Sequence, residues 1–376
     1  MRSAVCLLGL IAIGAIVAPV ARARSEHVLY IGTYTEKTAS KGIYAFRFND
    51  NTGALTSIGP VAETPNPSFL TASANGKFVY AVNELQTFDG APGGSVTAFA
   101  VDAGTSKLTQ LNVQATRGAA PCHLVLDKTG RFLAVANYSG GNYSLLPVGA
   151  DGRLQAAVSV VAGQPLEANP AKPLGHMVGF DAGNKYLITA DKGLNQMLVF
   201  TFDARSGKAA LNNTPPVMLP SGSGPRHYAF HPSGKWLFTI SEQAATITTF
   251  AWDPRTGTLT SRSSVPTRPA EVKSGSTAEI AVHKSGRFVY GSNRGHDSIA
   301  VFSVGADGAL TLVEYEPTRG QTPRNFALDP SGRWLIAANQ RTDTLAVFSI
   351  DQKTGALTPA GELTSAPSPV NILFMN

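Results

Sequence analysis

Residues 224–242, GPRHYAFHPSGKWLFTISE, carry side chains that can do acid–base and anion chemistry. Arg226 and His227 open one apolar run, and Glu242 closes the next, with a Pro-Ser-Gly turn between them. A guanidinium binds a carboxylate, a phosphate or a developing oxyanion through paired hydrogen bonds. A carboxylate or an imidazole can take a proton from water as a general base. If the two runs are neighbouring antiparallel strands, the turn between them brings Glu242 back beside Arg226.

The composition indicates an all-β protein with a large core. The chain has 376 residues, of which 43% are hydrophobic and only 15% are charged, and it contains 37 Gly and 24 Pro. Short apolar runs separated by Gly, Pro, Asn and Asp are typical of strands joined by turns. The absence of a sustained helical period in the sequence argues against α/β folds.

The first 23 residues have the pattern of a secretory signal peptide. Arg2 precedes the apolar segment CLLGLIAIGAIVAPV, and residues 21–23 (ARA) fit a small-x-small cleavage site. We therefore expect a periplasmic or secreted protein that is free of the membrane after cleavage. The alternative is a retained N-terminal anchor, for which the apolar stretch is short. Cleavage removes two arginines and no acid, so the formal charge falls from +6 to +4. This mild charge, without a basic run among aromatics, argues against a nucleic-acid partner.

Cleavage also leaves Cys122 as the single cysteine, because Cys6 lies in the signal peptide. One cysteine cannot form an internal disulfide. Cys122 begins the apolar run CHLVLD, where we expect a small buried thiol rather than a nucleophile.

A turn followed by an apolar run recurs six times. Successive copies are 46 to 54 residues apart, counted between their basic residues, close to the ~40–50 residues of a propeller blade. In the fourth copy, the runs RHYAFH, WLFTIS, TITTFAWD and TLTSRSS predict four antiparallel strands. The copies are NGKFVYAVNE (75–84), TGRFLAVANY (129–138), GNKYLITADK (183–192), SGKWLFTISE (233–242), SGRFVYGSNR (285–294) and SGRWLIAANQ (331–340).

Two fragments complete a seventh unit. Residues 27–58 match strands two to four of the repeat, and residues 370–375 match strand one. We therefore predict an all-β fold: one seven-bladed β-propeller domain over residues 26–376, closed by the N-terminal strands plus a C-terminal strand in one blade. An open solenoid is the alternative, but it would need polar capping repeats that neither end resembles.

The polar ends of the two inner strands of each blade converge on one rim. In an antiparallel pair, the start of strand one lies beside the end of strand two, so these positions surround one mouth of the central channel. They differ from blade to blade, unlike the scaffold residues, which argues for a binding or catalytic site. The strand-one starts are Pro67-Ser68, Cys122-His123, Gly175-His176, Arg226-His227, Ala278-Glu279, Arg324-Asn325 and Val370-Asn371, and the strand-two ends are Tyr34, Glu84, Tyr138, Lys192, Glu242, Arg294 and Gln340.

Other polar residues have structural interpretations. His227 follows Arg226 on a strand, so we expect it to face the opposite side of the sheet as a packing residue. His231 and His283 lie at the turn end, where we expect solvation. Three aspartates that precede turns are expected to cap them by accepting backbone N–H bonds. They are Asp127, Asp181 and Asp329.

The sequence contains no metal motif and no motif for a bound cofactor. There is no H-E-x-x-H, no EF-hand loop, no Walker loop and no G-x-S-x-G elbow. Glu84, Glu242 and Glu279 leave a Ca²⁺ site open, but the cations at the same mouth disfavour it. We expect neither metal nor cofactor.

Six segments form a distinctive set of motifs. They are GTYT (32–35), NPSFL (66–70), CHLVLDKTGRFLAVANYSGG (122–141), GSGPRHYAFHPSGKW (222–236), AEIAVHKSGRFVYGSNRGHDSIAVF (278–302) and TPRNFALDPSGRWL (322–335). This set resembles the motifs of the seven-bladed β-propeller lactonase family, which contains bacterial 6-phosphogluconolactonase and a fungal carboxy-muconate cyclase. The resemblance implies lactone chemistry without a metal or an organic cofactor. It implies His176, Arg226, Glu242 and Arg294 as catalytic residues. Lys192 departs from the family pattern.

The expected function is hydrolysis of the ring ester of a sugar-acid lactone by a monomer, with Glu242 or His176 as the general base. Further residues around the mouth are expected to bind the small anionic or sugar-lactone substrate. Export argues against a phosphorylated substrate. The alternatives are a muconate-type lactonising cyclase and a non-catalytic exported propeller that binds a ligand or a protein. The expected substrate-binding residues are His123, Glu279, Arg324 and His296.

Overall fold

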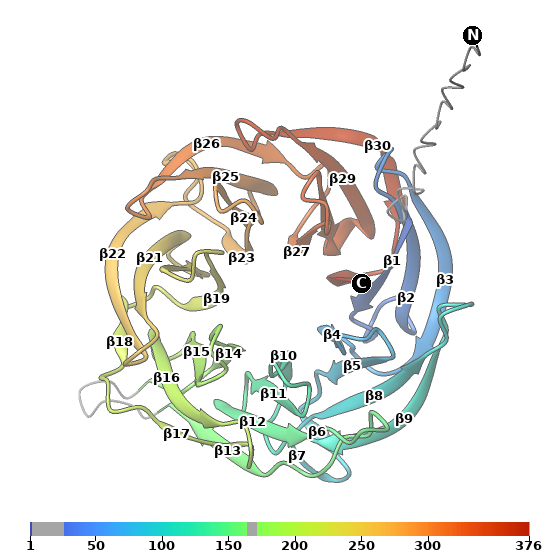
Figure 1. Ribbon diagram of the computed structural model, residues 1–376, viewed down its shortest axis with the longest axis vertical. Helices are drawn as coiled ribbons and strands as arrows, with labels where there is room; N and C mark the ends of the chain where they lie inside the picture. The colour runs from blue at the N-terminus through green and yellow to red at the C-terminus, as the bar shows by residue number, and fades with distance from the viewer. Residues whose placement is uncertain (2–25, 164–170, 376) are drawn as a thin grey trace.

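The computed structural model describes residues 26–163 and 171–375, together with Met1. Seven β-sheets surround a central channel, which confirms the predicted seven-bladed propeller (Figure 1). The predicted signal peptide, residues 1–23, lies outside the described residues apart from Met1. Within the described part, no helix has the length and apolar character needed to cross a membrane.

Each blade has four main strands, numbered from the channel outward, and blade 1 contains the first and the last strand of the described part of the chain. The innermost strands, in blade order, are β31 (Pro369–Phe374), β4 (Leu70–Ala72), β10 (Pro121–Leu126), β14 (Gly175–Phe180), β19 (Pro225–Phe230), β23 (Ser276–Val282) and β27 (Pro323–Leu328). The second strands are β1 (Glu26–Thr33), β5 (Phe78–Asn83), β11 (Phe132–Asn137), β15 (Tyr186–Asp191), β20 (Trp236–Ser241), β24 (Phe288–Arg294) and β28 (Trp334–Asn339).

The outer strands complete the sheets. The third strands are β2 (Gly42–Asn49), β8 (Ser95–Val101), β12 (Asn142–Pro147), β16 (Gln196–Asp203), β21 (Thr246–Asp253), β25 (Ser298–Val304) and β29 (Thr344–Ile350). The fourth strands are β3 (Leu55–Glu63), β9 (Leu108–Ala115), β13 (Ser159–Ala162), β17 (Lys208–Leu211), β22 (Thr258–Pro266), β26 (Leu310–Pro317) and β30 (Leu357–Ser365). Smaller elements are the hairpin β6 (Thr87–Phe88) and β7 (Ala91–Pro92), β18 (Val217–Met218) beside β16, and the 3₁₀ turn η1 (Gln340–Thr342).

Blade 1 closes the ring as the sequence predicts. Strand β31 from the C-terminus pairs antiparallel with β1, with Leu373 opposite Tyr30, and β1 pairs in turn with β2. In Figure 1 the C-terminal strand lies at the channel beside the N-terminal blade. Closure removes the free sheet edges that an open array would expose.

The core of the ring consists of seven hydrophobic clusters, and each fills the space between two neighbouring blades. Between blades 4 and 5, for example, Ile188 and Val199 pack against Phe250 and Trp252. Burial of these apolar side chains therefore stabilises the contact between neighbouring blades, and many polar side chains line the channel.

The recurring turn glycine between strands three and four has a packing role. Gly308 of blade 6 has φ +81°, and a Cβ at that position would lie 2.7 Å from the indole of Trp236 in blade 5. The same contact recurs around the ring. In each case the turn glycine packs on the aromatic residue that follows the basic residue of the repeat in the preceding blade. We call this contact the inter-blade joint. The other pairs are Gly53 on Trp334, Gly152 on Phe78, Gly207 on Phe132, Gly257 on Tyr186 and Gly355 on Phe288.

The turn-end predictions are confirmed for the aspartates and corrected for the histidines. Asp127 accepts bonds from the backbone N–H groups of Arg131 and Phe132, and Asp181 and Asp329 cap their turns likewise. The prediction that His231 and His283 are solvated is wrong for His283, which is buried, and His231 is half-buried. A ring nitrogen of each lies 2.9 Å and 2.8 Å from a carbonyl oxygen in the next blade, because the neighbouring turn packs over it.

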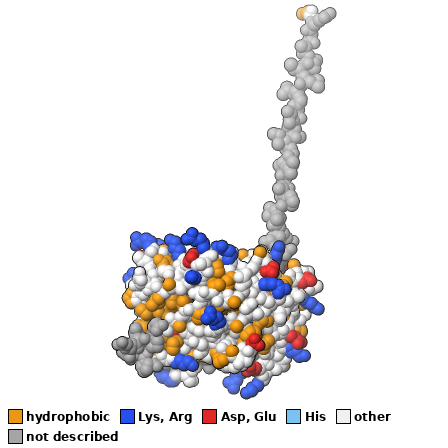
Figure 2. All heavy atoms as spheres, turned by 90° about the horizontal axis from the view of Figure 1, so that it is seen from below, with side chains coloured by type: hydrophobic (Ala, Val, Ile, Leu, Met, Phe, Trp, Pro, Cys, Tyr) orange, Lys and Arg blue, Asp and Glu red, His pale blue; other side chains and the backbone are white. Residues whose placement is uncertain are grey.

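Figure 2 views the ring edge-on. On the face shown, many Lys and Arg side chains lie near the upper and lower edges, and hydrophobic side chains are scattered over the wall between them, together with some charged ones.

Candidate active site

Bulges at the mouth ends of the inner strands turn two consecutive side chains into the channel. In blade 5, Pro225 pairs with Ser241 while His227 pairs with Ile240, so Arg226 is an extra residue in its strand. Blades 3, 4, 6 and 7 have register shifts at the corresponding place. A bulge breaks the strict alternation of strand side chains. The prediction that His227 faces away from Arg226 is therefore wrong: both side chains line one small cavity in the channel.

Glu242 is the centre of a cluster of cations at the mouth. Its Oε2 lies 3.1 Å from Arg226 Nε and 3.2 Å from Arg294 Nη2, and its Oε1 lies 2.6 Å from Lys192 Nζ. Burial raises the pKa of Glu242, but the charges of Arg226, Arg294 and Lys192 outweigh it and lower that pKa to about 2. The carboxylate is thus ionised at neutral pH.

The two arginines are also anchored to the backbone. Arg226 donates to the carbonyl of Ala278 at 2.7 Å, and Arg294 donates to the carbonyl of Thr277 at 2.7 Å. The side chain of Arg226 is only 3% exposed. Blade 5 therefore supplies Arg226 and Glu242, and the neighbouring blade 6 supplies the carbonyls that fix the two guanidinium groups.

A pocket of about 190 Å³ opens beside this cluster. Its charged lining consists of three cations and two carboxylates, so the pocket favours a small anion or a neutral ring that develops negative charge. His176, Cys122 and Tyr138 complete the wall. The charged lining residues are Lys192, Arg294, Arg324, Glu84 and Glu242.

Arg324 differs from the other cations in this pocket. Its Nη2 donates to the hydroxyl of Tyr34 at 2.7 Å, and its guanidinium lies 5.2 Å from the centre of that ring. The Tyr34 hydroxyl in turn donates to Glu84 at 2.9 Å. Among the described residues, Arg324 has no direct carboxylate partner within salt-bridge distance. Its remaining N–H groups are therefore available to a bound anion.

Three histidines lie together in the channel. The ring of His227 is 5.1 Å from that of His176 and 5.4 Å from that of His123, in edge-to-face arrangements. Phe69 packs against His123, with 4.3 Å between the centres of the two rings. Within the described part of the chain, His123 Nδ1, His176 Nδ1 and His227 Nε2 are buried and have no hydrogen-bond partner. Imidazole nitrogens without partners are unusual in a core.

These histidines are neutral at neutral pH. Burial, assisted by the charge of Arg226, lowers the pKa of His176 well below its usual range. Burial does the same to the pKa of His123, and it lowers the pKa of His227 although Glu279 opposes the shift. A neutral imidazole can accept a proton, so His176 lines the pocket in the form that a general base requires.

Cys122 is a buried free thiol, as the sequence predicts. Burial raises the pKa of its thiol, and the sulfur lies 3.4 Å from the carbonyl oxygen of His176. A thiol held in its protonated form is a poor nucleophile. Cys122 therefore serves as part of the pocket wall.

The structure brings most of the predicted site residues together. His176, Glu242, Arg294 and Arg324 line one pocket, and Arg226 bonds to Glu242 directly behind it. His123 and Glu279 lie deeper in the channel, each against His227. His296 does not join them. It lies in the turn after β24, with Nδ1 2.7 Å from Ser298 Oγ and its ring 5.9 Å from Tyr315 of the outer strand.

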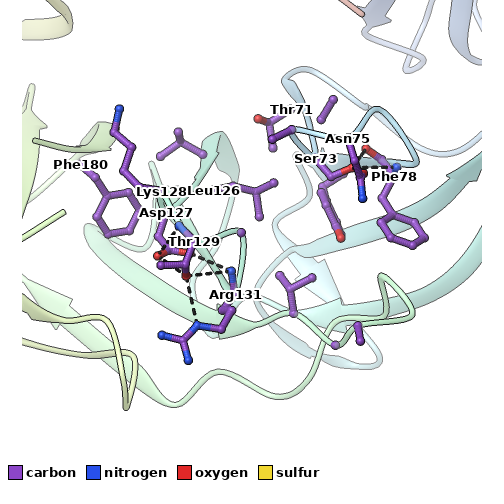
Figure 3. Close-up of a pocket in the computed structure, with 18 residues that line it drawn as sticks. Thr71, Ser73, Asn75, Phe78, Leu126, Asp127, Lys128, Thr129, Arg131 and Phe180 are labelled. Carbon is purple, nitrogen blue, oxygen red and sulfur yellow. Dashed lines mark hydrogen bonds between the residues drawn. The ribbon is translucent and has the colours of Figure 1, made fainter. Parts of the chain in front are cut away.

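A larger cavity of about 750 Å³ lies at the turn end of blades 2 and 3. Figure 3 shows Thr71, Ser73, Asn75 and Phe78 on one side of it and the segment from Leu126 to Arg131 on the other. Its acidic side chain, Asp127, is engaged in capping its own turn. The smaller pocket combines carboxylates, guanidinium groups and an imidazole, whereas the carboxylate of the larger cavity is already engaged.

The donor set does not resemble a metal site. In the part of the chain that the structure describes, no three His, Cys, Asp or Glu residues are arranged to hold a metal ion. Glu242 and Glu279 are each committed to basic partners.

Comparison with known proteins identifies the family. The model of a family described as "Lactonase, 7-bladed beta-propeller" matches residues 28–374. The chain belongs to this lactonase family. It is 34% identical over 356 residues to the 6-phosphogluconolactonase of Bacillus subtilis (strain 168), which spans 94% of this chain and 99% of that protein.

Two further relatives are also named as lactonases. The chain is 33% identical over 310 residues to the 6-phosphogluconolactonase of Formosa agariphila, spanning 80% of this chain and 86% of that one. Among solved structures, the periplasmic gluconolactonase of Pseudomonas aeruginosa superposes with a TM-score of 0.86 at 31% identity, covering 94% of this chain and 99% of that chain.

Proposed function

We propose that this protein hydrolyses the ring ester of a sugar-acid lactone in the pocket beside Glu242. The observation that carries the proposal is the convergence of Arg226, Arg294 and Lys192 on one partly buried carboxylate, next to a neutral imidazole. The names of the relatives, 6-phosphogluconolactonase and gluconolactonase, support the same reaction.

His176 is the general base in this proposal. Both oxygens of Glu242 are bonded to charged donors, Oε1 to Lys192 and Oε2 to Arg226 and Arg294, so neither oxygen is free to take a proton from water. His176 is neutral, and its Nδ1 has no partner among the described residues. Glu242 instead fixes the positions of the cations that surround the substrate.

The reaction has two steps. His176 takes a proton from a water molecule while the water oxygen attacks the lactone carbonyl, and the carbonyl oxygen becomes an oxyanion that Arg294 and Lys192 stabilise. The tetrahedral intermediate then collapses, the bond from the acyl carbon to the ring oxygen breaks, and His176 returns its proton to that oxygen. The product is a hydroxy acid, which ionises to a carboxylate at neutral pH.

Arg324 binds negative charge on the substrate or product. Its guanidinium lies over Tyr34, and among the described residues it has no direct acidic partner. A carboxylate can therefore form charge-assisted hydrogen bonds with it. The N-terminal pattern of residues 1–23 supports export, and an exported enzyme meets unphosphorylated sugar lactones, so we propose glucono-1,5-lactone or a related aldonolactone as substrate.

A pH-stat assay tests the proposed activity. The wild-type protein should accelerate hydrolysis of glucono-1,5-lactone above its spontaneous rate, and Arg294→Gln should reduce kcat/KM by at least about tenfold, as expected from loss of a charged oxyanion donor. Arg131→Gln is the matched control, since Arg131 lies in the turn at the opposite rim. A panel of aldonolactones and their 6-phosphates establishes the preferred substrate.

Other results would exclude the proposal. Formation of a lactone from a muconate, with no hydrolysis of any aldonolactone, would favour the cyclase. A rise in melting temperature with a sugar acid but no turnover of any lactone would favour a non-catalytic binding propeller.

We also propose that the protein is exported and acts as a monomer. The apolar segment of residues 1–23 and its small-x-small end support cleavage after Ala23. N-terminal sequencing of the protein from the periplasmic fraction tests this: a mature chain that begins at Arg24 supports it, and an uncleaved chain in the membrane fraction contradicts it. Gel filtration of the same material tests the monomer.

A further inference from the structure

Below the mouth, side chains from six of the seven blades form a belt across the channel. They occupy the second position of the polar pair at the start of their innermost strands, and in blades 3, 5, 6 and 7 a bulge lies beside this position. In blade 4 the register places Met177 there, and His176 is the extra residue of the bulge, at the level of Cys122 and Arg226. The belt changes character around the ring, from aromatic to imidazole to carboxylate to amide. Its members are Phe69, His123, His227, Glu279, Asn325 and Asn371.

The belt contains a carboxylate–imidazole pair that the proposed reaction does not use directly. Glu279 Oε1 lies 3.0 Å from His227 Nδ1, and Asn325 donates its amide N–H to Glu279 Oε2. The backbone N–H of Ile280 also donates to Oε1, at 3.0 Å. Asn325 is itself fixed, because its side-chain oxygen accepts a bond from the backbone N–H of Ile372.

These contacts determine the tautomer of His227. Burial raises the pKa of Glu279, but the interactions with His227 and Arg226 outweigh it and lower the pKa below its usual value, so the carboxylate is ionised. An ionised carboxylate only accepts hydrogen bonds, and therefore Nδ1 of a neutral His227 must carry the hydrogen. Nε2 is then the unprotonated nitrogen, and it is the ring atom that is buried without a partner among the described residues.

His227 links this pair to the pocket. It is 2% exposed, and its ring lies 5.1 Å from that of His176 with an angle of 69° between the planes. Tyr138 contacts His176 on another side, at 5.6 Å. The orientation of the His176 ring therefore depends on the plane in which Glu279 holds His227.

We propose that Glu279 and His227 are positioning residues for His176: Glu279 fixes the plane and the Nδ1–H tautomer of His227, and His227 holds the imidazole of His176 toward the lactone. This proposal rests on the proposed lactonase function. It follows the general logic by which a buried carboxylate orients an imidazole for proton transfer. The arrangement differs from a simple dyad, because the oriented ring acts through a second ring.

The first test uses the wild-type protein and no substrate. Long-range ¹H–¹⁵N correlation spectra of ¹⁵N-histidine protein distinguish a protonated from an unprotonated ring nitrogen, and loss of signals in His227→Gln assigns them. The proposal expects His227 at pH 7.5 with hydrogen on Nδ1 and none on Nε2. A hydrogen on Nε2, or on both nitrogens, would overturn it.

The second test separates positioning from binding. In Glu279→Gln the amide can donate to His227 Nδ1 and thereby favour the other tautomer. Because a misplaced general base loses part of its ~10²–10⁴-fold contribution, kcat should fall at least about tenfold while KM changes by less than about threefold. Glu279→Asp should recover only part of the loss, since the shorter side chain keeps the charge but retracts it from the imidazole.

His231→Gln is the matched control, because His231 lies at the other end of the same blade and bonds to the next turn. It should retain wild-type kcat. A folded Glu279→Gln protein with kcat within twofold of wild type would contradict the positioning role. Absence of any lactonase activity in the wild type would instead contradict the proposed function, and the tautomer of His227 would still be measurable.

Discussion

Glu242 Oε2 lies 3.1 Å from Arg226 Nε, although 16 residues separate the two along the chain. The antiparallel pairing of β19 and β20 returns the chain to the same rim, and the bulge at Arg226 points its side chain into the channel. Arg294 and Lys192 reach the same carboxylate from the two neighbouring blades. One partly buried carboxylate thus fixes cations from three blades around the pocket.

Glu242→Gln should destabilise the protein as well as inactivate it. The substitution leaves two arginines and a lysine without their counter-ion in a site where Glu242 is 15% exposed. Removing one partner of a buried ion pair typically costs ~3–5 kcal/mol, so we expect the free energy of unfolding to fall by about 3 kcal/mol. Urea denaturation measures it, with the exposed Glu271→Gln as control. Equal midpoints for the two variants would disprove the structural role of Glu242.

Arg324→Gln should weaken binding of the product more than it slows the reaction. The guanidinium is proposed to bind the carboxylate, and a charge-assisted hydrogen bond contributes ~1.5–3 kcal/mol. We expect the inhibition constant of gluconate to rise by at least about tenfold, while kcat changes less. Product inhibition kinetics measure both constants. An unchanged inhibition constant would assign the carboxylate to another cation of the pocket.

The three channel histidines should make stability depend on pH. Burial lowers the pKa of His123, His176 and His227 in the folded protein, so below pH 6.5 the unfolded chain binds protons that the folded protein does not. Stability should therefore fall as pH decreases from 7 to 5, by up to about 1.4 kcal/mol per pH unit for each histidine.

Glu242 and Glu279 do not add to this slope. Their folded-state pKa is lowered, so their contribution is fully present above the carboxylate pKa of the unfolded chain and is lost only at lower pH. His123→Asn should reduce the slope between pH 7 and 5 by about one proton, measured from urea unfolding at pH 5, 6 and 7. An identical slope in the variant would mean that His123 titrates normally.

The turn glycines can be tested against a natural exception. Gly308 has φ +81° and packs on Trp236, whereas blade 2 has Ser106 at the equivalent turn with φ +61°. Gly308→Ser should lower the free energy of unfolding by at least about 2 kcal/mol, from backbone strain and overpacking. Ser106→Gly should change it by no more than about 1 kcal/mol. Equal losses of unfolding free energy in the two variants, measured by thermal or urea unfolding, would contradict the packing role of the turn glycine.

Much of the fold could be predicted because the repeat is visible in the sequence. The spacing of the turns fixed the number of blades, and the match of residues 370–375 to strand one correctly predicted which strands close the ring. The rim positions of Arg226, Glu242 and Arg294 followed from strand order alone. These predictions used only the direction of the strands.

The details of the channel could not be predicted because they depend on the bulges. Strict alternation places His227 opposite to Arg226, and one extra residue in β19 reverses that conclusion. A signal was present, since pairs such as Arg226-His227 and Arg324-Asn325 put two polar residues in a row where a buried strand should alternate. His296 is among the substrate-binding residues expected from the sequence, but the turn that carries it points its ring to Tyr315.

The steady-state kinetics of His176→Asn with glucono-1,5-lactone test the central claim most directly. The claim is that a neutral His176, which lies beside the basic residues bound to Glu242, removes the proton from the attacking water. Since general-base catalysis contributes ~10²–10⁴-fold, kcat should fall by at least about 100-fold, with KM within about threefold of wild type and an unchanged melting temperature. A folded His176→Asn protein with wild-type kcat would contradict the account.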